Sequence, residues 1–383
     1  MKIVYLHHRN ICENTANNIQ VLSMCNAFAL NDCDVTLFIP NTESYTKTVE
    51  AIELKLGRKI NFHVEQFRYF NLRSITLSTY ISLLAFKSKS EFRRKLQKAD
   101  FVFTRQIIVY LLLRSLASKI IFEIHNSYFF DRNLINNYVI SRLRYYSKKS
   151  NTLLILISEN LKKYWENQLP DYKMIALHDG VNSESFKVQL SKSEARKKLG
   201  FDLERKIVSY IGSMYFDREI ENVIKLVARF KDVLFVMVGG PSKNVEYFKS
   251  LCSSEGVNNM IFTGYVAHPQ VPDYMYASDI LLALWSDKVS TINYCSPLKL
   301  FEYMASGRVV AAHGYITIRE VIQDKKNGFL VDPASSDALI NVIENILTTD
   351  DDKLEEISYR ARKEAMNNYS WKKRAEIVCQ SLI

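Results

Sequence analysis

The sequence predicts an α/β protein with two doubly wound, Rossmann-like domains, each built on a parallel sheet, that face each other across a cleft. Three observations support this fold class. The chain of 383 residues is long for a single core. Short β-rich runs alternate with longer helical patterns, as in βαβ units. The alternation starts again after residues 171–182, where the turn-forming residues Asp179 and Gly180 interrupt the pattern of strands and helices.

That interruption sets the expected domain boundaries. We expect the first domain at residues 1–175 and the second at residues 176–365. The last helical stretch runs from about residue 352 to the end and carries Trp371. Its final part, about 366–383, is expected to cross back to the first domain, as such a tail can do in two-domain folds of this kind.

Near-continuous apolar runs mark the strands, which suits parallel strands that are covered on both faces. In the first half they are expected at 2–6, 34–39, 61–65, 100–104, 120–124 and 153–157. In the second half they are expected at 207–211, 234–238, 260–263, 280–284 and 309–313. Helical patterns fill the gaps, for example at 16–30, 219–230 and 296–305.

Composition and cysteine usage favour a cytoplasmic globular protein. Apolar residues make up 48% and charged residues 24%, which is an ordinary globular balance. No secretory signal is evident, and no uncharged apolar run approaches the roughly 20 residues of a membrane span. The six scattered cysteines form no C-x-x-C pair, so we expect free thiols.

The basic excess lies entirely in the first half. Residues 1–170 carry 24 Lys and Arg against 13 Asp and Glu, whereas the remainder carries 27 against 28. Basic residues interleave with aromatic ones at 86–98 and 142–149. The stretch 75–96 could form an amphipathic surface helix or a pair of helices. Two explanations of this basic excess stay open, namely that it docks the protein on an anionic inner leaflet or that it is merely a solvated charged face. Binding of nucleic acid is a weaker alternative, because no nucleic-acid module accompanies the charge.

The strongest chemical signal is the segment 296–307, SPLKLFEYMASG, which follows a predicted strand. Pro297 suits the first helical position, which leaves the amides of Leu298 and Lys299 free at the positive end of the helix. Such an end binds a diphosphate, and Lys299 adds a mobile charge. Glu302, one turn further on, can accept two hydroxyl protons from a ribose. An amphipathic helix with an ordinary start is the plain alternative.

This segment, with Arg308-Val309-Val310 after it, resembles the donor-site helix of the retaining glycosyltransferase family 4, of GT-B fold, whose pattern is SPxKxxEYMAxG(K/R)xVV. Shorter resemblances follow the same order along most of the chain. They comprise 178–186 (NGvDxxxF), Gly239-Gly240 (ivGxG), 261–265 (vxFtGyv), 369–371 (ysW) and, more loosely, 14–37 and 122–125 (vxExH).

The resemblance implies roles for individual residues. It places Tyr265 in a segment whose backbone lies by the nucleotide base, and His125 beside the transferred sugar. Members often pair an Arg and a Lys after the first strand of the second domain. Here Gly212 is followed by Ser213 at the Arg position, and Arg218 falls at the Lys position, where it could also be a solvated helix-start residue.

Two further departures from the family pattern change the side chains that are expected in the site. Tyr294 stands where many members have a second glutamate that contacts the sugar, so that contact would come from Asn293 or from loop backbone. His7-His8-Arg9-Asn10 replaces the usual glycine-rich loop after the first strand.

The activity implied is transfer of a sugar, with retention, from a nucleotide diphosphate sugar to a lipid-linked saccharide acceptor. The setting implied is O-antigen, capsule or lipopolysaccharide synthesis, in the cytoplasm or on the inner face of the plasma membrane. The expected catalytic residues are His125, Glu302 and Lys299. The expected donor-binding residues are Gly212, Ser213, Arg218, Gly239, Gly240, Tyr265, Pro297, Leu298, Lys299 and Glu302.

No metal cofactor is expected. Asp32-Cys33-Asp34 looks like an Asp-x-Asp metal motif, but it lies between a helix and a strand, where a turn favours Asp. Two other functions stay open. A nucleotide-sugar epimerase of the same fold would form product from the donor alone. A non-catalytic binding subunit would bind the donor without turnover, and Tyr294 is the feature that supports it.

Overall fold

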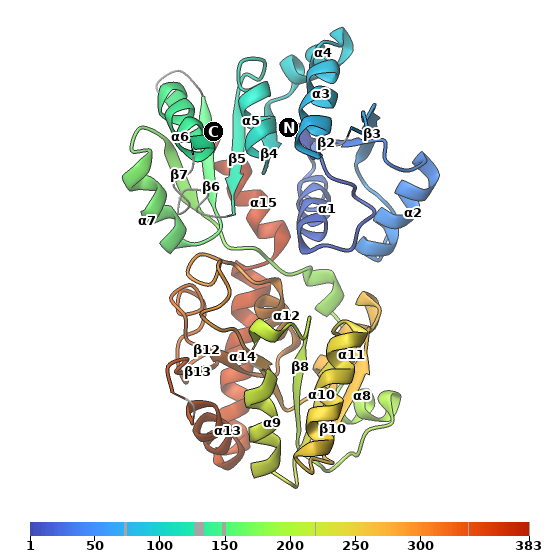
Figure 1. Cartoon of the computed structure of the whole chain (residues 1–383), viewed down its shortest axis with the longest axis vertical. Helices are drawn as coiled ribbons and strands as arrows, with labels where there is room; N and C mark the ends of the chain where they lie inside the picture. Colours follow the sequence, from blue (N-terminus) through green and yellow to red (C-terminus); the bar gives the residue numbers. More distant parts are fainter. Residues whose placement is uncertain (73–74, 126–133, 148–150, 219, 336, 383) are drawn as a thin grey trace. The chain divides into compact units, whose positions relative to one another are not determined.

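The computed structural model describes the whole chain except residues 73–74, 126–133, 148–150, 219, 336 and 383 (Figure 1). The chain forms two compact units. Unit 1 comprises Met1–Asp179 and Trp371–Ile383, and unit 2 comprises Gly180–Ser370. The units therefore change at residues 179/180 and 370/371, four or five residues after the boundaries expected from the sequence.

Within the described part of unit 1, a fully parallel sheet has the strand order β3-β2-β1-β4-β5-β6-β7. Its strands are β1 (Lys2–Leu6), β2 (Asp34–Pro40), β3 (His63–Phe67), β4 (Phe101–Thr104), β5 (Ile120–Ile124), β6 (Thr152–Leu156) and β7 (Lys173–Ala176). The six expected strands are confirmed, although β3 begins two residues later than expected. The edge strand β7 was not expected, because it is short and only half-buried.

Eight helices are described for unit 1. They are α1 (Ala16–Ala29), α2 (Tyr45–Leu56), α3 (Ile75–Lys87), α4 (Ser90–Lys98), α5 (Ile107–Leu113), α6 (Leu134–Ser147), α7 (Glu159–Gln168) and α15 (Trp371–Gln380). Thr15, Ser44 and Ser158 cap α1, α2 and α7 with their side-chain oxygens. Aromatic rings join α1 to the sheet, as Phe28 meets Phe101 and Phe103 edge-on at 5.8 Å.

Unit 2, in its described residues, holds a second parallel sheet with the order β10-β9-β8-β11-β12-β13. Its strands are β8 (Ile207–Ile211), β9 (Leu234–Val238), β10 (Met260–Gly264), β11 (Ile280–Ala283), β12 (Val309–His313) and β13 (Phe329–Val331). The three-residue β13 was not expected. The helices are α8 (Lys192–Leu199), α9 (Ile220–Arg229), α10 (Ser242–Ser254), α11 (Val271–Ala277), α12 (Leu298–Ser306), α13 (Ala338–Thr348) and α14 (Asp351–Asn368).

Alternate side chains of the unit 2 strands enter different cores, which shows that both faces of the sheet are covered. Leu281 and Ala283 pack with α12 and its neighbours, whereas Ile280 and Leu282 pack with α9, α10 and α13. This alternation explains the near-continuous apolar runs in the sequence and confirms the doubly wound class for this unit.

The expected long terminal helix is in fact two helices. α14 ends at Asn368 and belongs to unit 2, whereas α15 begins at Trp371, packs on α1 and belongs to unit 1. The chain breaks there because Tyr369 and Ser370 pair with Val181, whose amide donates to the Tyr369 carbonyl at 2.8 Å. The terminal helix therefore crosses back to the first unit, as expected, but it starts at 371 and not near 366.

Candidate functional site

Backbone contacts hold together the loops that follow three strands of unit 2. The Gly212 amide donates to the Val238 carbonyl, and the Gly239 amide donates to the Gly264 carbonyl, both at 2.9 Å. Gly239 and Gly240 have φ angles of +100° and +85°. A Cβ atom on Gly239 would lie 2.6 Å from the Gly212 carbonyl oxygen, so only glycine fits this approach. The predicted residues Gly212, Gly239 and Gly240 thus lie at one edge of the sheet.

Helix α12 is fixed to the same edge. The buried Tyr303 hydroxyl accepts from the Ile211 amide at 2.8 Å and donates to the Ile211 carbonyl at 2.9 Å, at the end of β8. Gly307, at φ +68°, ends the helix in the left-handed conformation, as the sequence indicates.

One detail of the helix start differs from the prediction. Pro297 is the N-cap of α12, with extended backbone at φ −80° and ψ 120°, and Leu298 is the first helical residue. The Pro297 carbonyl accepts from the Leu300 amide at 3.0 Å. The amides of Leu298 and Lys299 make no hydrogen bond to any residue that the structure describes. They leave the helix start able to receive an anion.

Lys299 supplies a cation beside these amides. Its ammonium lies 4.4 Å from the ring centre of Tyr210 and 4.5 Å from that of Trp285. Burial, with a smaller contribution from the positive charge of Arg218, lowers the pKa of Lys299 to about 7. Within the described chain, Lys299 forms no ion pair. A bound anion would therefore offset the electrostatic cost of burying this ammonium.

Three further predicted residues of this unit are Glu302, Tyr265 and Ser213. The Glu302 Oε1 atom lies 3.6 Å from the His268 Nε2 atom, and the bond to Glu302 raises the pKa of His268. Tyr265, after β10, exposes 77% of its surface. Ser213 is half-buried and its carbonyl accepts from the Tyr210 hydroxyl at 3.1 Å. No sequence pattern indicates His268 as a site residue, because only the fold brings it beside Glu302.

In unit 1, His125 belongs to a buried charged cluster at the end of β5. Glu123 is fully buried and accepts from the Arg374 Nη1 atom at 2.8 Å through Oε2. Its Oε1 atom contacts His125 and Gln20. Burial alone would raise the pKa of Glu123, but the charge of Arg374 and the hydrogen bond from His125 hold this pKa well below its ordinary value.

The cluster ties the terminal helix to the sheet of unit 1. From α15, Arg374 also donates to the carbonyls of His178 at 2.8 Å and Leu177 at 3.2 Å. Gln20 donates to the buried Asp179 carboxylate at 3.3 Å, and burial raises the pKa of Asp179. Sequence reasoning missed these partners. A glutamate inside the apolar strand 120–124 was the available signal, since such a charge requires a buried partner.

His125 itself is half-buried, and burial lowers its pKa, which favours the neutral imidazole at pH 7. Glu123 and Gln20 both contact its Nε2 atom, Gln20 at 3.4 Å. The ring is therefore held in place by fixed groups.

A cavity of about 700 Å³ lies in unit 1 beyond the ends of β1 and β4, where the strand order reverses. The unusual segment 8–10 forms part of its wall, and burial lowers the pKa of His8 to about 4, so this imidazole is neutral at pH 7. Most of the lining is polar and uncharged. The residues are His8, Arg9, Asn10, Glu13, Thr42, Tyr69, Thr79, Gln106, Ile107 and Ile108.

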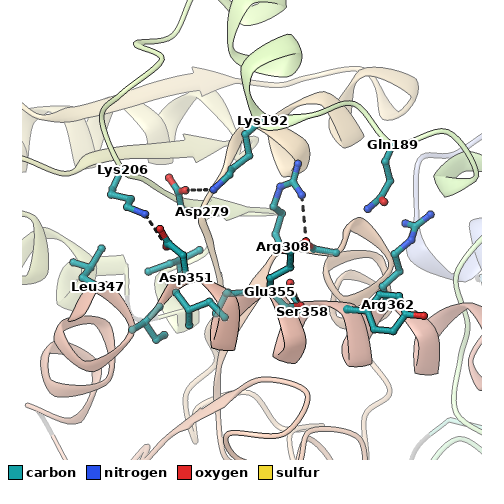
Figure 2. Close-up of a pocket in the computed structure, with 16 residues that line it drawn as sticks. Gln189, Lys192, Lys206, Asp279, Arg308, Leu347, Asp351, Glu355, Ser358 and Arg362 are labelled. Atoms are coloured by element: carbon teal, nitrogen blue, oxygen red, sulfur yellow. Dashed lines mark hydrogen bonds and ion pairs between the residues drawn. The ribbon is translucent and has the colours of Figure 1, made fainter. Parts of the chain in front are cut away.

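A second hollow, of about 430 Å³, lies in unit 2, and none of the predicted site residues lines it (Figure 2). Its cations already have partners. Lys192 pairs with Asp279 at 3.0 Å and Lys206 with Asp351 at 3.4 Å. Arg308 donates to the Tyr276 carbonyl at the end of α11, and Arg362 donates to the Ala305 carbonyl near the end of α12. These contacts cap helix ends, which is a structural role.

Two further expectations concern metal ions and membrane spans. Among the described residues, no three His, Cys, Asp or Glu side chains are grouped so as to hold a metal ion. Asp32 has a φ of +58°, as expected for a turn residue. All six cysteines are free thiols, as expected. No described helix combines the length and the apolar character needed to cross a membrane.

Comparison with known proteins identifies the class. Residues 191–364 match the family described as glycosyl transferases group 1. An uncharacterised glycosyltransferase of Methanocaldococcus jannaschii is 25% identical over 64% of this chain, and spore coat protein SA of Bacillus subtilis is 22% identical over 49%. These matches span 60% and 51% of the two relatives' own lengths.

Solved structures resemble the whole chain in fold. Sucrose-phosphate synthase from Thermosynechococcus elongatus has a TM-score of 0.73 at 15% identity, covering 99% of this chain and 98% of its own. The Anabaena protein HepE, solved with UDP-glucose, has a TM-score of 0.71 at 16% identity, with full coverage of both chains. The GT-B fold is thereby confirmed. Together with the family match, these findings support a glycosyltransferase, a transferase of the EC 2.4 class.

The buried ion pair predicts a specific loss of stability. Replacing Arg374 by Met leaves Glu123 buried without its main counter-charge, which is expected to lower the free energy of unfolding by about 3–5 kcal/mol. The matched control Lys372→Met removes an exposed cation two residues earlier in α15 and is expected to change the free energy of unfolding by less than about 0.5 kcal/mol. Urea denaturation followed by circular dichroism measures both. Equal effects of the two variants would contradict the assignment.

The same pair predicts acid sensitivity. Because the folded pKa of Glu123 lies well below its ordinary value of 4.5, its contribution to stability is fully present above that pH. The contribution is lost as the pH falls below 4.5 toward the folded pKa. The wild type should therefore lose more stability between about pH 5 and pH 3 than the double variant Glu123→Gln/Arg374→Met. Parallel stability profiles for the two proteins would show that Glu123 does not carry this dependence.

Proposed function

We propose that this chain transfers a sugar from a nucleotide diphosphate sugar to a saccharide acceptor, with the donor bound by unit 2 and the acceptor by unit 1. The observation that carries the proposal is the start of α12. There, the amides of Leu298 and Lys299 have no hydrogen-bond partner, and the Lys299 ammonium no ion pair, among the residues that the structure describes. The structure of HepE with UDP-glucose supports a nucleotide-sugar donor.

The diphosphate would lie against α12. The amides of Leu298 and Lys299, the Lys299 ammonium and the Arg218 guanidinium would stabilise the negative charge that develops as the diphosphate departs. These cations would take the part that a metal ion plays in other transferases, so we propose that no metal is needed. Glu302 would hold the ribose hydroxyls, and the segment that ends at Tyr265 would lie by the base.

Glycines of unit 2 would let the backbone approach the donor closely. Gly212, Gly239 and Gly240 present no side chain at the sheet edge, and Ser213 follows in the same loop. Tyr294 replaces the glutamate that many family 4 members use to contact the sugar. We propose that Asn293, which is exposed, or nearby loop backbone makes this contact.

His125 would position the sugar or the acceptor hydroxyl. Its neutral ring donates through Nε2 to the Glu123 carboxylate, which leaves Nδ1 to accept one hydrogen bond at a fixed place. We propose transfer with retention of configuration, as in family 4, on the basis of the motifs described above.

The acceptor would enter the cavity of unit 1, whose mostly polar and uncharged lining suits a hydroxylated ring. We propose a lipid-linked saccharide in the synthesis of O-antigen, capsule or lipopolysaccharide, at the cytoplasmic face of the membrane. The structures of the lipopolysaccharide outer core galactosyltransferase WaaB and of WaaG, a glycosyltransferase involved in lipopolysaccharide biosynthesis, support this setting, with TM-scores of 0.69 and 0.63.

Donor binding should depend on Glu302. Replacing it by Ala removes the proposed charge-assisted bonds to the ribose, worth about 1.5–3 kcal/mol, and should weaken donor binding roughly 10- to 100-fold. A thermal-shift screen of UDP, GDP and ADP sugars first identifies the donor, and isothermal titration then gives its Kd. Glu246→Ala, at an exposed position of α10, is the matched control. Unchanged affinity of Glu302→Ala would contradict the ribose assignment.

Donor affinity should also depend on pH through Lys299. The pKa of Lys299 in the protein is about 7, and a bound diphosphate would raise it. Affinity is therefore highest below pH 7 and should fall by up to about tenfold per unit as the pH rises above it. The nucleotide sugar is the suitable probe, because its phosphates stay ionised over this range.

The variant Lys299→Arg tests the origin of this dependence. Arginine remains charged, so Kd measured by titration from about pH 6 to pH 8.5 should be nearly flat for this variant. A slope equal to that of the wild type would assign the dependence to another group, such as His268.

A further inference from the structure

Helix α3 exposes an apolar face. Four large apolar side chains recur three or four positions apart, which places them on one side of the helix. They are Leu77, Tyr80, Ile81 and Leu84, with 49%, 43%, 36% and 39% of their surfaces exposed. Ordinary surface helices turn such a stripe toward the core.

Polar side chains occupy the opposite face of α3, where they are buried. Ser82 accepts from the Phe70 amide at 2.8 Å, and Ser78 accepts from the Leu72 amide at 2.9 Å. The Ser82 hydroxyl also donates to the Ser78 carbonyl at 2.6 Å. These bonds tie the helix to the segment before it, so rotating the apolar face inward would leave buried polar groups without partners.

Aromatic packing fixes the same orientation at the end of the helix. Phe86 stacks on Phe92 of α4 at 3.9 Å and on Phe67 of β3 at 4.8 Å. The hydrogen bonds of Ser78 and Ser82 and the packing of Phe86 therefore fix the orientation of α3 in which its apolar face is exposed.

Basic residues lie at the C-terminal end of α3, where the Arg93 Nε atom donates to the Lys87 carbonyl at 2.9 Å. α4 follows α3 directly (Figure 1), and residues 87–98 carry six Lys and Arg and a single Glu. Arg93, Arg94 and Lys98 are exposed. Lys95 is the exception, since it pairs with Glu65 at 2.5 Å. Burial lowers the pKa of Lys87, and the charges of Arg114 and Arg93 lower it further, so positive charges crowd at this end of α3.

We propose that the exposed face of α3 inserts into the interface of a bilayer that contains anionic lipids, while the basic residues of α4 contact the headgroups. Apolar side chains beside a cationic border are the combination that an anionic lipid surface binds, because burial and charge attraction add. A protein partner would not need the basic border.

The acceptor cavity lies directly behind this surface. Thr79, on the buried side of α3, lines that cavity together with Tyr69. Docking through α3 would therefore hold the acceptor site next to the membrane. This link to a lipid-linked acceptor rests on the function proposed above.

Vesicle sedimentation tests the surface. The full chain should sediment with phosphatidylglycerol–phosphatidylcholine vesicles and much less with phosphatidylcholine alone. The variant Tyr80→Ser/Ile81→Ser/Leu84→Ser should bind the anionic vesicles at least about tenfold more weakly, since it loses the burial of three apolar side chains in the bilayer interface. The variant Arg93→Glu/Arg94→Glu should also lose binding, and it leaves the Lys95–Glu65 pair intact.

The matched control is Tyr45→Ser/Leu54→Ser, which removes two exposed apolar side chains of α2 in the same unit. It should bind vesicles like the wild type. Equal binding by the α3 serine variant and the wild type would overturn the proposal, as would a wild type that does not sediment. A dimer in solution that the α3 variant dissociates would instead assign the face to a second copy of this chain.

A separate measurement isolates this inference from the proposed function. The α3 variant leaves unit 2 unchanged, so its affinity for the donor should equal that of the wild type. If the α3 variant loses vesicle binding but keeps the donor affinity of the wild type, the result supports the proposed membrane-binding face of α3. Failure of the wild type to bind any nucleotide sugar would count against the proposed function and leave the vesicle result to stand by itself.

Discussion

Burial of a parallel sheet on both faces is the constraint on which both units depend. Strands that are covered on both sides leave no polar face, so functional groups gather where the strands end. In unit 2 that edge carries the glycine loops after β8 and β9 and the start of α12. In unit 1 it carries His125 after β5 and the segment 8–10 after β1. The two units thus reach comparable sites by the same architecture.

The units treat buried charge in opposite ways. Glu123 in unit 1 has its counter-charge in Arg374, and the pair joins strand β5 to helix α15 within a rigid frame. Lys299 in unit 2 rests on the rings of Tyr210 and Trp285 with no carboxylate beside it in the described chain. The charges of an ion pair neutralise each other, so the pair serves the structure. A cation that packs only against aromatic rings can still bind an anion. This contrast distinguishes the framework of the protein from its proposed chemistry.

Much of the fold could be predicted because long apolar runs bounded by turn residues specify buried parallel strands. The edge strands β7 and β13 escaped prediction because four and three residues are too few to form a recognisable strand pattern. The break at Tyr369–Ser370 escaped as well, since it depends on a contact with Val181 that is distant in sequence. The sequence predicts Pro297 as the first helical residue, whereas the structure has it as the N-cap. Proline suits both positions equally, so the sequence does not distinguish them.

The site was predictable only where residues lie close together in the sequence. Pro297, Leu298, Lys299 and Glu302 share one helix, so their spacing carried the prediction. Glu123 and Arg374 are 251 positions apart, and no local pattern could pair them. The orientation of α3 belongs with these cases. Its sequence indicated an amphipathic surface helix, but only the hydrogen bonds of Ser78 and Ser82 show that the apolar side faces outward.

The most direct test of the account is a crystal structure of this chain with its nucleotide diphosphate bound. If the diphosphate binds at the start of α12, its oxygens will lie within hydrogen-bond distance of the Leu298 and Lys299 amides and of the Lys299 ammonium. A nucleotide that binds in solution but places its diphosphate elsewhere, for example in the hollow of Figure 2, would contradict it.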